Sequence, residues 1–195
     1  MVPIRPIRLF GKWRQGYALD RHTVQSVLVG HDEFGNPQFD TKRTPLGELL
    51  YQLKYRSDAS ALKPIVETVV AFVQQKHVQC SVLIPVPPSR EGRTSQPVME
   101  IAIAVARTLG WHLSSTAVAK TKPTTELKDV HDYQQRLRVL NGAFVARPAE
   151  VNGRSVLLFD DLYRSGATLS AVTDALLTAG AADVFVLTLT RTKRS

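Results

Sequence analysis

Two adjacent carboxylates precede a loop of small and hydroxyl-bearing residues in the last quarter of the chain. Asp160 and Asp161 follow the apolar run 156–159, and residues 164–168 read Arg-Ser-Gly-Ala-Thr before an expected helix over 169–179. Loop amides and a helix N-terminus form an anion site, because unpaired N–H groups and the positive end of the helix dipole point at the ligand. The two carboxylates would repel that anion, so they suit hydroxyl groups or a metal-loaded part of the same ligand. The pattern predicts a site for a ribose 5-phosphate.

Each residue type in this loop has a chemical reason to be there. Gly166 allows a close approach of the backbone, and the hydroxyls of Ser165 and Thr168 can donate to phosphate oxygens. The alternative is that the acids only cap a helix or bind a metal ion. The histidines have no spacing that predicts a metal site, and Cys80 precedes an apolar run, which favours a place in the core.

The elements that must position this motif alternate in type. Apolar runs at 81–84, 156–159 and 184–187 predict buried strands, and amphipathic patterns predict helices over 98–109 and 169–179. Strands buried on both faces and separated by helices imply an α/β fold with a parallel sheet. In such sheets, ligands bind beyond the carboxyl ends of the strands. The loops at 85–96, 119–136 and 160–168 are therefore the candidate site.

The first part of the chain has a different pattern. Residues 24–29 predict a strand, and the turn residues at 32–37 predict that it opens a hairpin or a small sheet. Thr44-Pro45 then begins a helix, and a second helix follows from about residue 60. We expect an N-terminal strand and hairpin element over 1–43 and an α/β domain over 44–195.

Composition limits the class of protein. The chain has 195 residues, 44% of them hydrophobic, which is enough to bury a core, and its one Cys can form neither an internal disulfide nor a zinc cluster. No apolar run is long enough to span a bilayer, so we expect a soluble, cytoplasmic protein without membrane contact. The net charge is +8, with excesses of +4 over 1–57 and +3 over 119–155. That excess suits a polyphosphate ligand or a nucleic-acid backbone, and a merely solvated basic surface is the alternative.

The Asp-Asp motif with its Ser-Gly-Ala-Thr loop resembles the phosphoribosyl pyrophosphate (PRPP) motif of type I phosphoribosyltransferases. Residues 44–192 are similar to the ComF family, the competence-associated phosphoribosyltransferase-like proteins. The segments that carry this second resemblance are Leu53-Lys54-Tyr55, residues 84–89, residues 122–128, Arg136 with Gly142-Ala143-Phe144, and residues 187–191. The resemblance implies the type I phosphoribosyltransferase fold, with the N-terminal hairpin as a hood element.

The resemblance also implies a role for individual residues. Asp160 and Asp161 would be catalytic and hold the ribose hydroxyls, directly or through Mg²⁺, which would be bound mainly by PRPP. The 5-phosphate would be wrapped by Arg164, Ser165, Gly166, Ala167 and Thr168. The pyrophosphate would face a loop containing Pro85, Val86, Pro87, Arg90 and Arg93, through backbone amides and the two arginines. A mobile loop that closes over the site would contain Lys120, Lys122, Lys128 and Arg136.

Three departures from the family pattern qualify these roles. The single Cys excludes the four-cysteine zinc module with which ComF relatives often begin, and the family's Arg-Gly-Phe-Asn-Gln stretch is reduced to residues 93–96. Position 164 is Arg, which cannot act as the base that an Asp provides in many purine phosphoribosyltransferases.

Two functions remain open after the sequence analysis. The first is transfer of ribose 5-phosphate from PRPP to an unidentified small-molecule acceptor, with release of pyrophosphate and with Mg²⁺ as cofactor. The second is a non-catalytic protein that senses PRPP or a nucleotide and binds single-stranded DNA. The oligomeric state is unknown from the sequence.

Overall fold

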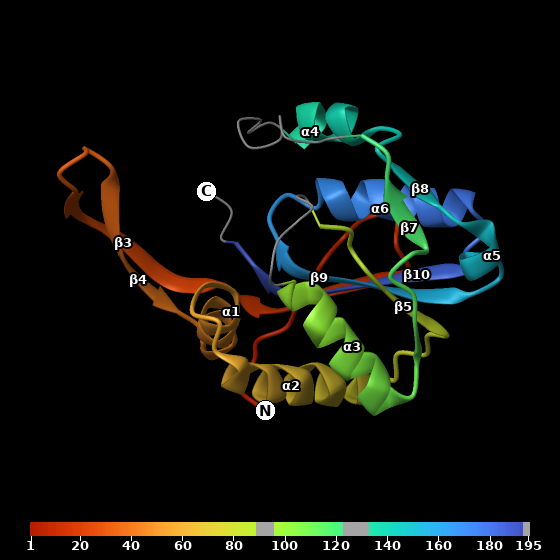
Figure 1. Ribbon diagram of the computed structural model, residues 1–195, viewed down its shortest axis with the longest axis horizontal. Coiled ribbons are helices and arrows are strands. Elements are labelled where there is room, and N and C mark those ends of the chain that lie inside the picture. Colours follow the sequence, from red (N-terminus) through yellow and green to blue (C-terminus); the bar gives the residue numbers. More distant parts are fainter. Residues whose placement is uncertain (89–95, 123–132, 193–195) are drawn as a thin grey trace.

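A six-stranded sheet runs through the molecule, with helices packed on both of its faces (Figure 1). The computed structural model describes residues 1–88, 96–122 and 133–192. The strands of the sheet lie in the order β1-β2-β10-β9-β5-β6, and all neighbouring pairs are parallel except β1 with β2. Their bounds are β1 Ile7–Arg8, β2 Gln15–Arg21, β5 Val82–Pro85, β6 His112–Leu113, β9 Ser155–Tyr163 and β10 Asp183–Arg191. The predicted α/β fold with a mostly parallel sheet is confirmed.

Side chains of β9 show how the sheet separates two cores. Val156 and Leu158 belong to a cluster on the α6 side, whereas Leu157 and Phe159 belong to a second cluster that includes α1, α2 and α3. Alternate residues of a strand point to opposite faces, so a strand covered on both sides must be apolar at every position. That requirement explains the continuous apolar run from which the strand was predicted.

Strand β2 was not predicted, although it lies inside the sheet, between β1 and β10. Its sequence, Gln-Gly-Tyr-Ala-Leu-Asp-Arg, mixes small, charged and apolar residues and lacks a continuous apolar run. Only Ala18 and Leu19 are fully buried hydrophobic residues there, and the pairing with β10 supplies the rest of the fit. Because this pairing joins residues far apart in sequence, local pattern carries little signal for it.

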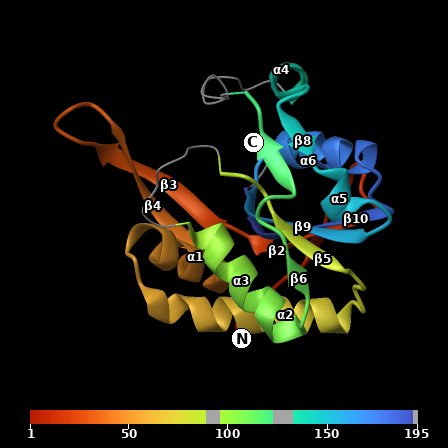
Figure 2. The ribbon, with the colours of Figure 1, turned by 45° about the vertical axis from the view of Figure 1, so that its right-hand side comes forward.

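The predicted hairpin is present as a two-stranded ribbon, and we call it the arm (residues 23–43). Its strands are β3 Thr23–His31 and β4 Pro37–Arg43, joined by the predicted turn. The arm projects away from the body of the molecule (Figures 1 and 2). Residues 1–21 instead belong to the main sheet through β1 and β2, so the sheet extends across the boundary expected at residue 43. The division into two domains stays a prediction.

Helices cover both faces of the sheet. Helices α1, α2 and α3 lie on one face and α6 on the other (Figure 1). Their bounds are α1 Pro45–Tyr55, α2 Leu62–Gln75, α3 Pro97–Leu109 and α6 Ala167–Thr178, with a short 3₁₀ turn η1 at Ala59–Ala61. These four helices were predicted within a few residues. None of the helices in the described part of the chain is long and apolar enough to cross a bilayer.

The segment 119–136 showed no clear period, and the structure contains two short strands and a helix around it. Strands β7 Val118–Lys120 and β8 Phe144–Ala146 form an antiparallel pair, and helix α4 is Tyr133–Leu140. A short helix, α5 Pro148–Val151, leads into β9. These elements are too short for a periodic pattern, and they pack on the α6 side of the molecule.

Helix α1 begins at a capping contact that also ties it to the sheet. Thr44 accepts a hydrogen bond from the Gly47 amide at 3.0 Å, and its hydroxyl donates to the Arg21 carbonyl at 2.6 Å. The same side chain therefore satisfies a helix amide and fixes the helix start beside the end of β2. This contact positions the C-terminal turn of α1, which carries Lys54.

We predict that Thr44→Ala lowers the free energy of unfolding by about 1–2 kcal/mol, because an N-cap hydrogen bond and a second, partly buried hydrogen bond are lost. Urea denaturation followed by circular dichroism measures the change. Thr108→Ala is the matched control, since Thr108 is exposed and its hydroxyl donates only to a carbonyl of its own helix. Equal destabilisation by the two substitutions would contradict the role given to Thr44.

Candidate functional site

A cavity of about 380 Å³ opens at the carboxyl edge of the parallel sheet. It is lined by four chain segments that are remote in sequence: the end of α1, the loop after β5, the start of α3, and the end of β9 with the start of α6. The predicted site residues among its lining are Asp160, Asp161, Arg164, Thr168, Pro85, Val86 and Pro87. The structure therefore brings together most of the described residues that the sequence analysis selected.

The two acids lie inside β9 rather than after it, because the strand continues to Tyr163. Asp161 follows the alternation of Leu157 and Phe159 and meets Lys54 of α1, with Nζ 2.5 Å from Oδ2. Asp160 follows the alternation of Val156 and Leu158, which pack on the α6 side, so we infer that its side chain points to that face. The acids thus approach the cavity from opposite faces of the sheet.

Lys54 is a functional candidate to which the sequence analysis gave no chemical role. Its side chain is 20% exposed and that of Asp161 is 14% exposed, so the ion pair is largely shielded from water. Removing one member of such a pair leaves an uncompensated charge in a poorly solvated place. In the sequence, Lys54 was noted only as part of the segment Leu53-Lys54-Tyr55, which resembles the ComF family. The fold shows that the Lys54 side chain reaches Asp161. Tyr55 also lines the cavity.

Asp160 is held in a different electrostatic state. Burial raises the pKa of its carboxyl above the usual range, and the neighbouring charge of Asp161 raises it further. Two contacts act in the opposite direction, namely the Asp161 amide, which donates to Asp160 Oδ1 at 2.9 Å, and the charge of Lys54. Without a ligand, Asp160 therefore holds a proton at pH values where Asp is normally ionised.

The turn after β9 leads directly into α6. Gly166 caps this helix with φ near 80°, a left-handed conformation that favours glycine. Ser165 accepts a long hydrogen bond of 3.4 Å from the Ala167 amide, and Thr168 reaches the cavity. The first amides of an α-helix have no partner within the helix, so the start of α6 offers backbone donors beside the acids, of which the Ala167 amide already donates to Ser165.

Gly166 serves the fold as well as any ligand. A Cβ at this position would lie 2.5 Å from the hydroxyl of Tyr163 and 2.8 Å from ring carbons. The absence of a side chain therefore lets the buried Tyr163 ring pack under the turn. Ser165, Gly166 and Ala167 form the turn but are not among the residues that line the cavity.

The described part of the loop after β5, residues 85–88, cannot supply amides in the way expected from the resemblance. Pro85, Pro87 and Pro88 have no N–H group, and the Val86 amide already donates to the Phe159 carbonyl at 2.8 Å. Within the described part of this loop, up to residue 88, no backbone donor is left for a pyrophosphate. Arg90 and Arg93 lie outside the described residues.

The residues expected on a mobile loop lie on the α6 side of the molecule. Lys120 ends β7, Arg136 lies in α4, and the Lys122 ammonium donates to the Asn141 carbonyl at 3.3 Å. None of these three lines the 380 Å³ cavity as the described residues form it. Lys128 lies outside the described residues.

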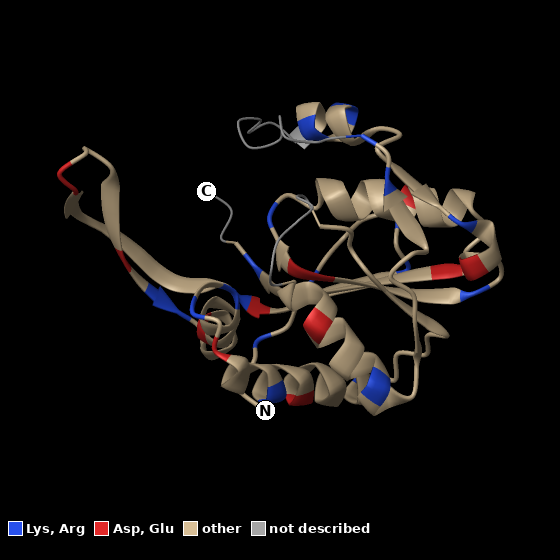
Figure 3. Ribbon diagram, in the orientation of Figure 1, with Lys and Arg blue, Asp and Glu red and all other residues tan. Residues whose placement is uncertain are grey.

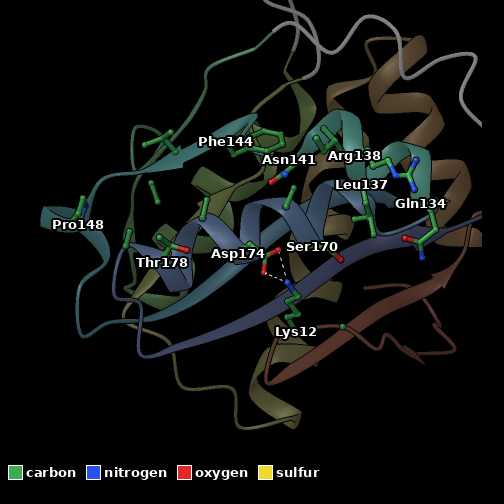
Figure 4. Close-up of a pocket in the computed structure, with 18 residues that line it drawn as sticks. Lys12, Gln134, Leu137, Arg138, Asn141, Phe144, Pro148, Ser170, Asp174 and Thr178 are labelled. Atoms are coloured by element: carbon green, nitrogen blue, oxygen red, sulfur yellow. Dashed lines mark hydrogen bonds and ion pairs between the residues drawn. The ribbon is translucent and has the colours of Figure 1, made fainter. Parts of the chain in front are cut away.

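A second, larger cavity of about 760 Å³ lies between α4, β8 and the outer side of α6, and we call it the α4–α6 groove (Figure 4). Leu137 and Phe144 line one side, and the α6 residues Ser170, Asp174 and Thr178 line the other. No predicted site residue is among its lining. It is therefore separate from the site at the carboxyl edge.

Other chemical possibilities find little support. Burial raises the pKa of the Cys80 thiol to about 12, so it is not a thiolate at neutral pH, and it packs against the core as expected. Over residues 1–88, 96–122 and 133–192, no three His, Cys, Asp or Glu side chains cluster as a metal site would require. The carboxyl edge of the sheet remains the candidate site.

Comparison with solved structures identifies the class of fold. Adenine phosphoribosyltransferase from Leishmania tarentolae matches with a TM-score of 0.50 and 10% identity, over 90% of this chain and 91% of that one. The enzyme from Giardia lamblia, complexed with 9-deazaadenine, matches with a TM-score of 0.49 and 16% identity, over 87% and 94% of the two chains. The fold is that of the type I phosphoribosyltransferases, and at these identities the likeness extends to the fold alone.

Further comparisons limit what the likeness covers. Glutamine PRPP amidotransferase from Bacillus subtilis, complexed with ADP and GMP, matches with a TM-score of 0.44 and 20% identity over 66% of this chain, which spans only 26% of that longer protein. No protein-family profile and no curated protein matches the chain. The ComF resemblance is therefore not confirmed by these comparisons.

The raised pKa of Asp160 predicts a pH-dependent cost in stability. Between about pH 4, where an unfolded Asp ionises, and its higher folded pKa, the folded protein binds the extra proton, so stability falls as pH rises. Asp160→Asn keeps an acceptor for the Asp161 amide but removes this cost. We expect its Tm to exceed that of the unsubstituted protein by about 3 °C or more at pH 8 and to match it at pH 4.

Asp161→Asn is the companion variant. It leaves Lys54 without its partner, so its Tm should fall at pH 8. Differential scanning calorimetry at both pH values measures these shifts. An Asp160→Asn protein that is no more stable than the unsubstituted one at pH 8 would show that the carboxyl is not destabilised by burial.

Proposed function

We propose that the protein binds PRPP and transfers its ribose 5-phosphate to a small-molecule acceptor, with release of pyrophosphate. The observation that carries the proposal is one cavity lined both by the two acids of β9 and by Arg164 and Thr168 of the turn that follows them. An anion site and a hydroxyl-binding site a few residues apart match the two ends of a ribose 5-phosphate. The fold is one in which this chemistry is known.

The turn at 164–168 would hold the 5-phosphate. Its backbone amides and the N-terminus of α6 offer hydrogen bonds and a favourable dipole, and Thr168 adds a hydroxyl. Arg164 is exposed and lines the cavity, so it adds positive charge beside the phosphate.

The acids of β9 would receive the ribose hydroxyls. Carboxylate oxygens accept hydrogen bonds from a diol, and a ligand diol donating to Asp160 would favour its ionised form. Lys54 offsets the charge of Asp161 until the ligand arrives and stands at the cavity wall, where it can turn to an anionic part of PRPP. We assign Lys54 to the binding site on this ground.

Mg²⁺ fits this site as a partner of the ligand rather than of a protein cage. Only two carboxylates are present at the described site, and one of them is paired with Lys54. Asp160 and Asp161 could contribute oxygen ligands, while PRPP would supply the others. When bound, the ion would neutralise charge on the pyrophosphate leaving group.

The reaction would form a bond between the acceptor and ribose C1 and break the bond from C1 to the pyrophosphate oxygen. The electron pair of the broken bond leaves with pyrophosphate, and the acceptor's proton passes to the departing pyrophosphate or to water, because Arg164 is not a base at neutral pH. The protein's part is to position the two reactants and to stabilise charge. This division of labour explains why the cavity needs no nucleophilic side chain.

We further propose that the chain is a ComF-like member of this superfamily. What supports it is that two of the resembling segments, Lys54-Tyr55 and residues 85–88, line the same cavity as the Asp-Asp motif. The alternative function, binding of single-stranded DNA, has no support beyond the basic excess. It stays a prediction that salt titration with an oligonucleotide can test.

Isothermal titration with PRPP and Mg²⁺ tests the proposed function. The double variant Asp160→Asn with Asp161→Asn should weaken PRPP binding about 100-fold or more, because two charge-assisted contacts to the ribose are lost. Thr168→Ala should weaken it about tenfold through one phosphate contact. Pyrophosphate release from PRPP without acceptor reports whether the bond to C1 is cleaved.

The exposed substitution Thr108→Ala, outside the cavity, is the control and should leave PRPP affinity unchanged. Thermal unfolding of each variant shows that the fold is kept. No measurable PRPP binding by the unsubstituted protein with Mg²⁺ would remove the proposal. Loss of inorganic phosphate binding in the double Asp variant would show that the acids support the phosphate turn instead.

A further inference from the structure

The arm exposes apolar side chains along its whole length. Leu28 and Phe39 are cross-strand partners, so they share one face of the ribbon. The large hydrophobic residues exposed on the arm are Val24, Val27, Leu28, Val29, Phe34 and Phe39. An isolated two-stranded hairpin is at best marginally stable in water. Exposed apolar side chains on a marginally stable ribbon indicate that another surface covers the arm.

The tip of the arm is built to hold one aromatic side chain outward. Asp32 accepts hydrogen bonds from the backbone amides of Phe34 at 2.9 Å and Asn36 at 2.8 Å. The Asn36 side-chain amide, which donates to Asp32 at 3.0 Å, lowers the pKa of the Asp32 carboxyl together with these backbone amides. The turn is therefore fixed without any help from the Phe34 ring, which is 81% exposed. A rigidly presented aromatic residue is typical of an interface anchor.

Charge indicates what the arm can pack against. Residues 23–41 contain three acids, Asp32, Glu33 and Asp40, and no Lys or Arg, whereas the rest of the chain has 25 Lys and Arg against 14 acids. Acidic residues mark the tip, and basic residues appear only where the arm joins the body (Figure 3). Two arms would repel each other, and an arm would be attracted to the body of another copy.

The α4–α6 groove is a complementary surface on that body. Ala171 and Ala175 are among its lining residues, and Leu137 and Phe144 form an apolar wall (Figure 4). Lys12 and Arg138 lie among its described lining residues, and Asp174, the one acid among those residues, pairs with Lys12 at 2.8 Å. The groove is mainly apolar, and Arg138 is the cation of its described lining that this ion pair does not neutralise.

The arm cannot fill the groove of its own chain, because the two are well separated in both views of the molecule (Figures 1 and 2). We propose that the arm of one copy packs into the α4–α6 groove of a second copy, and that the second copy reciprocates. A two-fold axis that relates the two contacts closes such a dimer, whereas the same contact repeated head to tail would build an open chain, which sedimentation would show as larger species. The proposal does not depend on the function assigned to the other cavity.

Sedimentation equilibrium of the full chain tests the arm. The unsubstituted protein should be a dimer at micromolar concentration, and raised salt should weaken it. Phe34→Ser with Phe39→Ser should raise the dimer dissociation constant about 30-fold or more, as the loss of interface anchors does. Ile103→Ser is the control, since Ile103 is a 41% exposed apolar residue on α3, outside both surfaces.

A second variant tests the groove. Val145 lines it and is 54% exposed, so Val145→Glu should fold normally while placing an acid where the acidic arm must dock. The dimer dissociation constant should again rise about 30-fold or more. Ile103→Glu is the matched control for an added acid and should leave the dimer intact.

Mixing the two variants distinguishes the proposed contact from other dimers. The Val145→Glu chain keeps an intact arm, and the doubly substituted arm variant keeps an intact groove. The mixture should therefore form a heterodimer through one arm–groove contact, although neither variant dimerises alone. Contact between two arms would leave Val145→Glu dimeric and the mixture unassociated with the arm variant.

Three results would overturn the proposal. The first is an unsubstituted protein that stays monomeric at about 100 μM and low salt, where an electrostatically assisted interface is strongest. The second is a Val145→Glu protein that still forms the dimer. The third is a mixture of the two variants that contains no heterodimer. Circular dichroism of each variant, compared with the unsubstituted protein, separates loss of association from loss of fold.

Discussion

The parallel pairing of β9 with β10 and β5 determines where the candidate site residues lie. Parallel strands bring their carboxyl ends to the same edge, so the loop after β5 and the turn after β9 meet there regardless of their distance in sequence. β9 extends four residues beyond its last pairing with β5, at Phe159, and this extension carries both acids. The site exists because one strand is longer than its neighbour.

A second dependence is the ion pair between Lys54 and Asp161. Helix α1 is fixed at its start by Thr44 and at its end by this ion pair, so the α1 layer and the sheet edge are joined at two points. The pair also makes two adjacent acids tolerable at one place, because one of them is compensated while the other retains its proton. A ligand with negative charge could replace Asp161 as the partner of Lys54, and its hydroxyl groups could donate to the two carboxylates in place of the proton on Asp160.

Much of the fold could be predicted from local pattern, and the reasons are visible in particular elements. β9 and β10 contain runs of successive apolar residues because both faces of the sheet are covered there. The start of α1 could be predicted from Thr44, which caps the helix, and Pro45, its first residue. β2 was not predicted because its residues show no strand pattern of their own, and its place in the sheet depends on pairing with β10, which is distant in sequence. The short elements β7, β8 and α4 contain too few residues for a period to appear.

The site shows the same division between local and non-local information. The acids and the turn at 164–168 form one continuous motif, so their proximity followed from sequence. The partnership of Lys54 with Asp161 spans more than a hundred residues, and only the packing of α1 against the sheet reveals it. The hydrogen bond from the Val86 amide to the Phe159 carbonyl could not be predicted from sequence either, because it depends on the register between β5 and β9.

The alternation of side chains along β9 has a consequence for how this protein can change. Asp160 follows the alternation of residues that pack towards α6, and Asp161 follows that of residues that pack towards α1, α2 and α3. The charge of Asp161 nevertheless raises the pKa of Asp160, and neighbouring groups that interact have non-additive effects. Repacking either layer would therefore change both carboxylates, so the two faces of the sheet have to evolve together at this point of the strand.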